Sequence, residues 1–515
     1  MLTWKEWWKR HEFLYTWFSK ESGVTTGESS IETLSPAVQQ LVGRLLKMLQ
    51  DDDDYYDVRA AAAIALGKIG QNTPEIRRAL IKGLKDKDQT VQGASALSLG
   101  MIRAVEATNH LTGILKNKRE KESVRTRAAV ALGLMDNSAN LHPLQTIFNA
   151  PDTKDEVKAG TLLAMGLLQN ERAAYTLYPV LMSNYDEELQ ALAVAALAKI
   201  GTTTITFRRG RRSTEIDIID LFEKRLAKKT TKDEVRRSIA MALGTIGKEE
   251  TSIDALKRAY TSDRDKGVKG FALLSLAQMK KGEANKVVVR DFLRRALMRE
   301  KDVVVRGFAA LAVGLSQDQD AGQLLLDVFN SNDRPDVRAA AAVGLGIIKY
   351  KPALPDLGQE VKNPRDGGDA RGYAAVALGM IGDPASTKYL KSVYETVNDP
   401  YLKWMTATGL GLLGHKNRDQ AAIDLVKKDL SDGSLAIRKA AVRSIAYFRD
   451  DTTIDPLVEQ FKEEGNDELR ALIVVSLGNI ADTAEETPIL RRIGKNVNWV
   501  AAVRMKSIEL LTRLK

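Results

Sequence analysis

The sequence predicts an all-α protein, a right-handed α-solenoid of about 13 helix–turn–helix repeats with a cap at each end. Three observations support this fold class. The 515 residues include only 13 prolines and 6% aromatic residues, and alanine and leucine are abundant, which favours helix. The segment "DVRAAAAIALGKIG" at 57–70 returns as "DVRAAAAVGLGIIK" at 336–349. Similar segments recur at steps of mostly 32 or 33 residues, and a fixed period of this size is typical of repeat arrays.

Each copy of the segment has helical periodicity. Counting its first apolar residue as position 1, positions 1, 5, 8, 9 and 12 are apolar or small. The longest steps between copies are 46, 37 and 35 residues, and a degenerate copy follows near Val500. If neighbouring helices stack about 8–10 Å apart, thirteen repeats predict a curved rod on the order of 100 Å long. The copies begin at Val58, Val91, Val124, Val157, Leu189, Val235, Val268, Val305, Val337, Ala370, Leu402, Ile437 and Leu469.

Two further positions of the copy have structural interpretations. Position 2 is usually basic, as in Arg59, and an acidic residue such as Asp57 often precedes position 1. We expect these charges to pair between successive repeats, and we favour this over a phosphate-binding role. Position 10 is usually glycine, as in Gly67 and Gly133. Glycine inside a helix costs about 1 kcal/mol relative to alanine, so its recurrence indicates close approach of neighbouring helices.

Second amphipathic helices lie between the copies, for example at 73–86 and 452–465. The shared pattern D-x-x-V-R-x-x-A-A-x-A-L-G-x-[IL]-G resembles the HEAT-repeat superfamily, in the short bacterial version called PBS-lyase HEAT-like repeats, and extends over roughly 36–515. The resemblance implies an α-solenoid. Members of the superfamily include scaffolds, transport adaptors, chromophore lyases and nucleic-acid binders, so the resemblance is specific for fold and leaves the function open.

Five segments follow from this organisation. We expect a tryptophan-rich cap helix and linker at 1–30, repeats 1–5 at 31–200, a basic loop or hairpin insertion at 201–215, repeats 6–13 at 216–497, and a capping helix at 498–515. Four of the six tryptophans lie within the first 17 residues. The first helix is interpreted as a cap over the first repeat or, alternatively, as a helix that contacts a membrane surface or a partner. The residues that would form this face include Trp4, Trp7, Trp8 and Phe18.

The insertion concentrates positive charge. Residues 207–237 hold eleven Lys or Arg against six Asp or Glu, which is half of the chain's net charge of +10. One interpretation is a solvated insertion without a partner, and the other is a patch that faces nucleic acid, a phosphorylated protein or lipid headgroups. The candidate anion-binding residues are Arg208, Arg209, Arg211, Arg212, Lys224, Arg225, Lys228 and Lys229.

Four copies carry an aromatic residue near the start of the helix, in "VKGFALL" (268–274), "VRGFAAL" (305–311), "ARGYAAV" (370–376) and "LKWMTAT" (402–408). The rings could fill core space beside the adjacent glycine. Alternatively, they could line the concave face and anchor a peptide or helix of a partner. The candidate partner-binding residues are Phe271, Phe308, Tyr373 and Trp404.

No catalytic motif is recognised. "GLGLLG" at 409–414 matches a dinucleotide-binding fingerprint, but it closes a repeat helix and lacks the preceding strand that the fingerprint requires. The four histidines are widely separated, and there is no cysteine. We therefore expect no catalytic residues, no bound metal and no cofactor.

The sequence favours a non-enzymatic scaffold or adaptor that binds protein through the concave face. The first alternative is binding of nucleic acid or another polyanion through 201–237, and a weaker one is a phycobilin-lyase-like enzyme. We expect a protein partner and a monomer, with nucleic acid less favoured and membrane-surface contact through the first helix an alternative. No signal peptide or membrane-spanning segment is recognised. The default expectation is a cytoplasmic protein, or an exported one if the N-terminus is processed.

Overall fold

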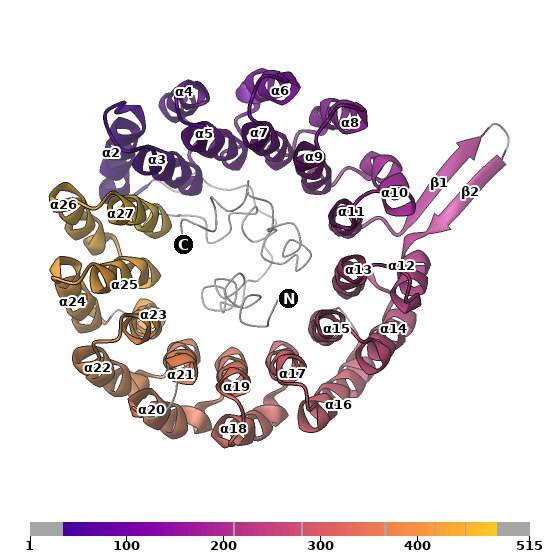
Figure 1. Cartoon of the computed structure of the whole chain (residues 1–515). Coiled ribbons are helices and arrows are strands. Elements are labelled where there is room, and N and C mark those ends of the chain that lie inside the picture. The colour runs from indigo at the N-terminus through magenta and orange to yellow at the C-terminus, as the bar shows by residue number, and fades with distance from the viewer. Residues whose placement is uncertain are drawn as a thin grey trace. The chain divides into compact units, whose positions relative to one another are not determined.

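The computed structural model describes residues 34–481, apart from 210–211, 280–281, 365–367, 418 and 449. The described residues divide into two compact units. Unit 1 is Val105–Tyr350, and unit 2 combines residues 34–104 with 351–481. Together they contain 26 α-helices and one two-stranded sheet, which confirms the predicted all-α solenoid class (Figure 1). Within the described residues, no helix has the length and apolarity needed to cross a bilayer.

Each unit is a series of helix pairs. The helices of unit 1 are α6 (Thr108–Lys116), α7 (Glu122–Leu134), α8 (Leu141–Asn149), α9 (Asp155–Leu167), α10 (Ala174–Met182), α11 (Glu187–Ile200), α12 (Ile218–Ala227), α13 (Asp233–Ile246), α14 (Glu249–Ser262), α15 (Lys266–Gln278), α16 (Glu283–Arg299), α17 (Val303–Leu315), α18 (Gly322–Asn330) and α19 (Pro335–Ile347). Those of unit 2 are α2 (Pro36–Gln50), α3 (Tyr56–Ile69), α4 (Pro74–Gly83), α5 (Gln89–Met101), α20 (Leu354–Lys362), α21 (Gly368–Ile381), α22 (Thr387–Thr396), α23 (Pro400–Asn417), α24 (Gln420–Lys428), α25 (Leu435–Ile445), α26 (Ile454–Glu463) and α27 (Asp467–Ile480).

The odd-numbered helices are the thirteen predicted copies. Within unit 1, α7 packs on α9 and each later odd-numbered helix packs on the next, and each also packs on an even-numbered helix. Odd-numbered helices are buried on nearly all sides because they contact three neighbours. Even-numbered helices bury a single stripe, as Ile454, Leu457, Val458 and Phe461 do in α26. This i, i+3, i+4, i+7 spacing is the stripe that an amphipathic helix turns toward a core.

The basic residue at position 2 pairs with a carboxylate of the next repeat, as expected. The carboxylate is not the one directly ahead of position 1 that the sequence suggested. Arg59 Nη2 lies 2.9 Å from Asp86 Oδ1, and both side chains are buried. Asp86 lies in the loop that precedes the next odd-numbered helix, not directly ahead of position 1. The loop places its carboxylate against the start of the preceding odd-numbered helix. The same arrangement joins Arg236 to Asp263, Arg306 to Asp333, Lys403 to Asp429, and Arg438 to Glu464.

The glycine at position 10 lies where two odd-numbered helices approach most closely. A Cβ atom added to Gly133 would lie 2.6 Å from Ala164 Cα and 2.7 Å from Ala164 O. Ala164 is position 8 of the next copy. The same contact of position 10 with position 8 recurs between Gly67 and Ser98, Gly166 and Ala196, Gly244 and Ser275, Gly314 and Gly344, and Gly379 and Gly409. The predicted close approach is therefore confirmed.

Replacing Gly133 by alanine is expected to lower the free energy of unfolding by about 1–3 kcal/mol, because the new methyl group would overlap backbone atoms that cannot move independently. Gly43 is the matched control, since it lies inside α2 and a Cβ there meets nothing within 4 Å. Gly43→Ala should raise stability by about 0.5–1 kcal/mol. Urea denaturation followed by circular dichroism measures both changes, and equal effects of the same sign would contradict the packing argument.

The first described repeat packs on the last one within unit 2. Helix α3 contacts α27, and Arg470 Nη1 lies 2.8 Å from Asp54 Oδ1. We expected a rod with two separate caps, but the two described end repeats are neighbours instead. The expected caps at 1–30 and 498–515, with Trp4, Trp7, Trp8 and Phe18, lie outside the described residues.

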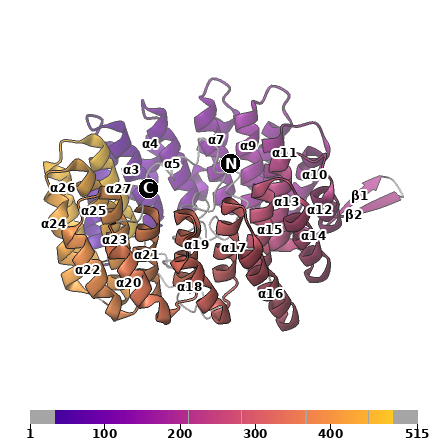
Figure 2. The ribbon, with the colours of Figure 1, turned by 60° about the horizontal axis from the view of Figure 1, so that its bottom comes forward.

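The insertion forms a β-hairpin of β1 (Thr204–Arg209) and β2 (Arg212–Asp217). The strands are antiparallel, with Phe207 opposite Thr214. The Phe207 ring lies 5.4 Å from the Tyr175 ring and 5.5 Å from the Tyr178 ring, and Tyr175 Oη donates to Thr206 O. The middle of β1 is therefore packed on α10, and the two strands project outward from the helices (Figures 1 and 2).

Candidate interaction surface

Three of the four aromatic candidates lie in the core. Phe271, Phe308 and Tyr373 are only 3%, 0% and 1% exposed, so the expectation that these rings contact a partner is wrong. For Phe308, the physical reason is the glycine at position 3 of the preceding copy. A Cβ at Gly270 would lie 2.3 Å from the Phe308 ring, so the ring occupies the space that the missing side chain leaves.

Trp404 differs from the other three because its ring is partly exposed. Its centroid lies 6.1 Å from that of Tyr401, and the Arg443 guanidinium lies 5.8 Å from its ring. Burial lowers the pKa of Arg443. The indole Nε1 is buried and donates to no acceptor among the described residues. Trp404 remains a predicted partner contact, but without the aromatic track that was expected to accompany it.

For the arginines of the basic insertion, the structure gives the position of the backbone in the hairpin. Arg208 and Arg209 lie at the end of β1, Arg212 begins β2, and Arg211 lies outside the described residues. Arg208 pairs in register with Ser213, and Arg209 pairs with Arg212. The three described candidates thus lie in the last two residue pairs of the hairpin, and the anion-binding role of all four remains a prediction.

Two of the candidate cations of α12 have structural partners. Lys224 Nζ lies 2.7 Å from Asp220 Oδ2, one turn earlier on the helix. Arg225 is half-buried and donates to Gln190 Oε1, and burial lowers its pKa. The side chains of Lys228 and Lys229, directly after α12, are exposed and form no ion pair within the described residues. Of these four cations, Lys228 and Lys229 are the two without a side-chain partner among the described residues.

The start of α13 holds two arginines that bind carboxylates of the neighbouring repeat. Arg236 Nε and Nη2 donate to the two oxygens of Asp263, both at 3.0 Å. Arg237 donates in the same two-pronged way to Asp265, at 2.8 and 2.6 Å. Burial alone would raise the pKa of Asp265, but the hydrogen bonds from Arg237 and from the Val268 N–H outweigh it and lower the pKa. Bidentate arginine–carboxylate pairs are strong and directional, so these groups are committed to joining the repeats.

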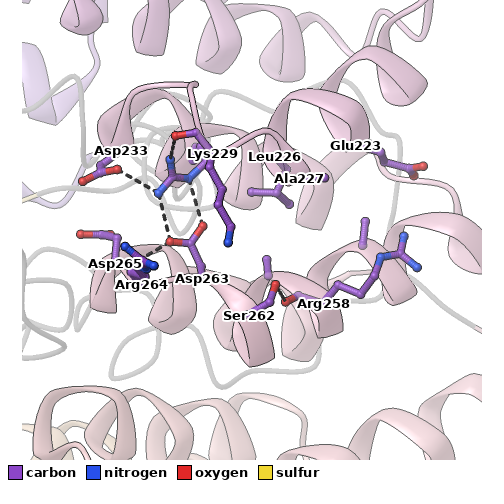
Figure 3. Close-up of a pocket in the computed structure, with 13 residues that line it drawn as sticks. Glu223, Leu226, Ala227, Lys229, Asp233, Arg258, Ser262, Asp263, Arg264 and Asp265 are labelled. Atoms are coloured by element: carbon purple, nitrogen blue, oxygen red, sulfur yellow. Dashed lines mark hydrogen bonds and ion pairs between the residues drawn. The ribbon is translucent and has the colours of Figure 1, made fainter.

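A cavity of about 530 Å³ lies beside these pairs, between the end of α12, the start of α13 and the end of α14. Lys229, Arg258 and Arg264 line it together with the paired acids Asp233 and Asp263 (Figure 3). The three cations come from two successive repeats, and their side chains are exposed. None of the three forms an ion pair with a described residue.

We define the basic edge as eight exposed cations at the carboxyl ends of three successive even-numbered helices. The carboxylates near this edge are already engaged: Asp233 and Glu234 with the α13 arginines, and Asp302 with Lys266 Nζ at 2.6 Å. Glu300 accepts from backbone N–H groups, and its charge adds to burial in raising the pKa of Tyr260 to about 12. The basic edge consists of Lys228, Lys229, Lys232, Arg258, Arg264, Arg295, Arg299 and Lys301.

Basic side chains in the last turn also stabilise a helix through its macrodipole, and this alone could explain some of them. It does not explain Lys232 and Arg264, which lie outside the helices. Sequence reasoning recognised Lys228 and Lys229 and missed the α14 and α16 cations. The detectable signal was the recurrence of basic residues at the ends of successive even-numbered helices, about one repeat apart.

The described residues contain no group of three histidine, aspartate or glutamate side chains placed to hold a metal ion. The geometry defines a helical-repeat protein in which pairs between a basic residue and a carboxylate join successive repeats. The family model for HEAT repeats matches residues 42–133, 263–346, 290–371 and 395–478, together more than half of the sequence. The chain belongs to the HEAT-repeat family.

Comparison with individual proteins adds little to this. No curated protein matches the sequence. Among solved structures, the chain is similar to YibA of Escherichia coli, with 16% identity, 53% of this chain and 99% of that chain covered, and a TM-score of 0.33. It is similar to yeast importin-β (Kap95p), with 13% identity, 87% and 69% covered, and a TM-score of 0.42. It is similar to human deoxyhypusine hydroxylase, with 16% identity, 74% and 98% covered, and a TM-score of 0.25. At these values, the three likenesses do not bear on the partner of this chain.

Proposed function

We propose that this chain is a non-enzymatic HEAT-repeat scaffold that binds an acidic segment of a protein partner along the basic edge. The observation that supports this most is the separation of charge at the ends of α12, α14 and α16. Carboxylates there are bound by arginines, lysine or backbone N–H groups, whereas eight exposed cations have no described ion-pair partner. The surface offered to solvent is therefore positive, and it extends over three repeats.

A polypeptide suits this surface better than a nucleic acid. The cavity between α12 and α14 carries both signs of charge, with Lys229 and Arg258 near the paired carboxylates of Asp233 and Asp263. An acidic peptide can give its side-chain carboxylates to the cations and its backbone N–H groups to the remaining lone pairs of the acids. A phosphate backbone offers no such donors, and its dense negative charge would lie close to those same acids.

This interface lies on the even-numbered helices and not on the odd-numbered helices that carry the aromatic candidates. A concave surface anchored by aromatic rings needs accessible rings, and Phe271, Phe308 and Tyr373 are core residues. Trp404 alone does not make an extended site. The even-numbered helices present the exposed charge, and the basic hairpin between α11 and α12 lies next in the chain to the same repeats.

Charge reversal at the cavity tests the proposal. The triple variant Lys229→Glu, Arg258→Glu and Arg264→Glu should bind a fluorescein-labelled oligo-glutamate peptide at least about tenfold more weakly than the natural chain. Each exposed pair contributes roughly 0.2–1 kcal/mol, and each reversal adds repulsion. Fluorescence anisotropy at several salt concentrations measures the affinity, which should fall as salt rises.

The matched control changes the same number of charges in unit 2. Lys47, Lys82 and Lys85 are exposed lysines, and the variant Lys47→Glu, Lys82→Glu and Lys85→Glu alters net charge equally. It should leave peptide affinity within about twofold, because none of these lysines belongs to the basic edge. Equal loss in both variants would indicate non-specific attraction and contradict a defined site. Tighter binding of single-stranded or duplex oligonucleotides than of the peptide, lost in the first variant, would replace the protein partner by nucleic acid.

A further inference from the structure

The two ends of the described repeat series meet in unit 2 in the same way as consecutive repeats. A Cβ added to Gly478 of α27 would lie 2.7 Å from Ala65 Cβ of α3. Gly478 is position 10 of its copy, and Ala65 is position 8 of the first copy. This is the same register as Gly133 on Ala164 and Gly379 on Gly409. Helix α3 therefore occupies the place that a following repeat would take after α27.

The charge pairing has the same register. Arg470, at position 2 of α27, donates to Asp54 Oδ1 and Oδ2 at 2.8 and 3.1 Å. Asp54 lies in the loop before α3, as Asp86 lies in the loop before α5 and Glu464 in the loop before α27. The junction thus repeats both contacts that join successive repeats, although Arg470 and Asp54 are 416 residues apart in the sequence.

The even-numbered helices add polar contacts at the junction. Ser35 Oγ donates to Asp451 Oδ2 at 2.6 Å, and Arg44 Nη1 lies 3.4 Å from Asp455 Oδ1. The second pair is exposed, at 36% and 80% for the two side chains. Between α3 and α27 themselves, Lys68 Nζ donates to Asn479 Oδ1 at 2.5 Å. Exposed ion pairs are weak and are screened by salt, so this part of the junction depends on ionic strength.

The junction between α27 and α3 differs from the contacts between consecutive described repeats in the length of chain that links the two helices. Consecutive repeats are held together by short loops, which give their faces a high effective concentration. The faces of α3 and α27 have no such loop between them, and closing a longer chain segment has a larger entropic cost. The contacts are the same in kind, but the covalent link that holds them together is much longer.

The two faces also differ from one another, since one presents Gly478 and Arg470 and the other presents Ala65 and Asp54. A face of one kind fits only a face of the other kind, and an identical pairing is available between two chains. Exchange of equivalent contacts between copies of one protein is a known route to oligomers.

We propose that the α2–α3 and α26–α27 faces form a reversible junction, and that a second copy of this chain occupies both faces in exchange when the junction opens. The partner is identified by the contacts themselves, because the α27 face of one chain is complementary to the α3 face of any other copy. The proposal does not depend on the basic edge or on its ligand.

Exchange between chains provides the test. The natural sequence has no cysteine, so a donor dye on Lys47→Cys of α2 and an acceptor dye on Glu459→Cys of α26 can be placed on separate chains. Both positions are exposed in the structure. Mixing the two preparations gives energy transfer only if the end of one chain pairs with the opposite end of another. Transfer should increase slowly, faster at higher protein concentration and at higher salt.

Arg470→Ala should increase the rate of exchange about tenfold, because it removes the bidentate pair that joins the two ends. Arg438→Ala is the matched control: Arg438 makes the same kind of bond to Glu464, but between repeats joined by a loop. It should leave the exchange rate unchanged. The double variant Arg470→Asp with Asp54→Arg should restore the slow rate, and circular dichroism should show that all variants are folded. Absence of transfer in Arg470→Ala at tens of micromolar protein, or equal acceleration by Arg438→Ala, would overturn the proposal.

Discussion

Replacing Phe308 by alanine is expected to lower the free energy of unfolding by about 3–5 kcal/mol. The ring is 0% exposed, and its centroid lies 5.7 Å from that of Phe271. Truncation removes the ring from a site that Gly270 leaves open for it, and α15 and α17 cannot collapse into the space without losing their register. Urea denaturation of the whole chain, followed by helical circular dichroism, measures the loss.

Phe292 is the matched control for this prediction. It lies on α16, is half-buried, and contacts the ring of Tyr260 at 5.6 Å. Phe292→Ala should cost clearly less than Phe308→Ala, since part of the ring already contacts water. The two variants should also bind the oligo-glutamate peptide as the natural chain does. A loss of affinity in Phe308→Ala with unchanged stability would show that this ring contacts a partner and is not a core residue.

Removing Arg59 is the second change with a large expected effect. Arg59→Ala should lower the free energy of unfolding by about 3–5 kcal/mol, because it leaves a buried carboxylate without its cation. The Arg59 and Asp86 side chains are 1% and 7% exposed, and Arg59 also donates to the carbonyl oxygen of Asp54. The loss should appear as a lower midpoint in chemical denaturation with similar helical content beforehand.

Arg44→Ala removes an ion pair of the opposite kind and is the control. Arg44 and Asp455 are 36% and 80% exposed, so the loss should stay below about 1 kcal/mol. Replacing both Arg59 and Asp86 by apolar residues of similar size should recover most of the stability lost in Arg59→Ala, because no unpaired charge then remains buried. Equal costs for Arg59→Ala and Arg44→Ala would contradict the role assigned to the buried pairs.

The repeat architecture could be predicted because the residues that join neighbouring repeats recur at the same positions of each copy. Val58, Arg59 and Gly67 recur at the same positions of later copies, and these positions are the contacts between odd-numbered helices in the structure. The partner of the position-2 arginine could not be predicted in the same way. The conformation of the loop before α5 places the Asp86 carboxylate beside Arg59. That conformation cannot be inferred from the number of residues between the two.

The candidate site was predicted only in part for a similar reason. Lys228 and Lys229 are adjacent in the sequence and were recognised as basic. Arg258 and Arg264 join them only because one repeat stacks on the next, about 30 residues later in the chain. The aromatic residues left two interpretations open, a core position and a partner contact, and the core interpretation holds for Phe271, Phe308 and Tyr373. The glycine that accommodates Phe308 belongs to the preceding copy, so the local pattern "RGF" did not show that the ring was enclosed.

The contact between the first and the last described repeat has one recognisable signal in the sequence, which is the composition of the first copy. A repeat with a free outer face needs polar residues there, but the first copy is as rich in alanine as any interior copy. Residues 60–63 are all alanine and are at most 1% exposed. The unbroken run of alanine at 60–63 is the signal that α3 is covered on both sides, although nothing in the sequence identifies α27 as its neighbour.

Hydrogen exchange with mass spectrometry, with and without the oligo-glutamate peptide, tests the proposed interaction surface most directly. The account predicts slower exchange in residues 224–237, 258–266 and 295–302 when the peptide is bound, with no change in 370–382 or 402–413. Slower exchange around Tyr373 and Trp404, with no change at the basic edge, would contradict it and place the interface on the odd-numbered helices.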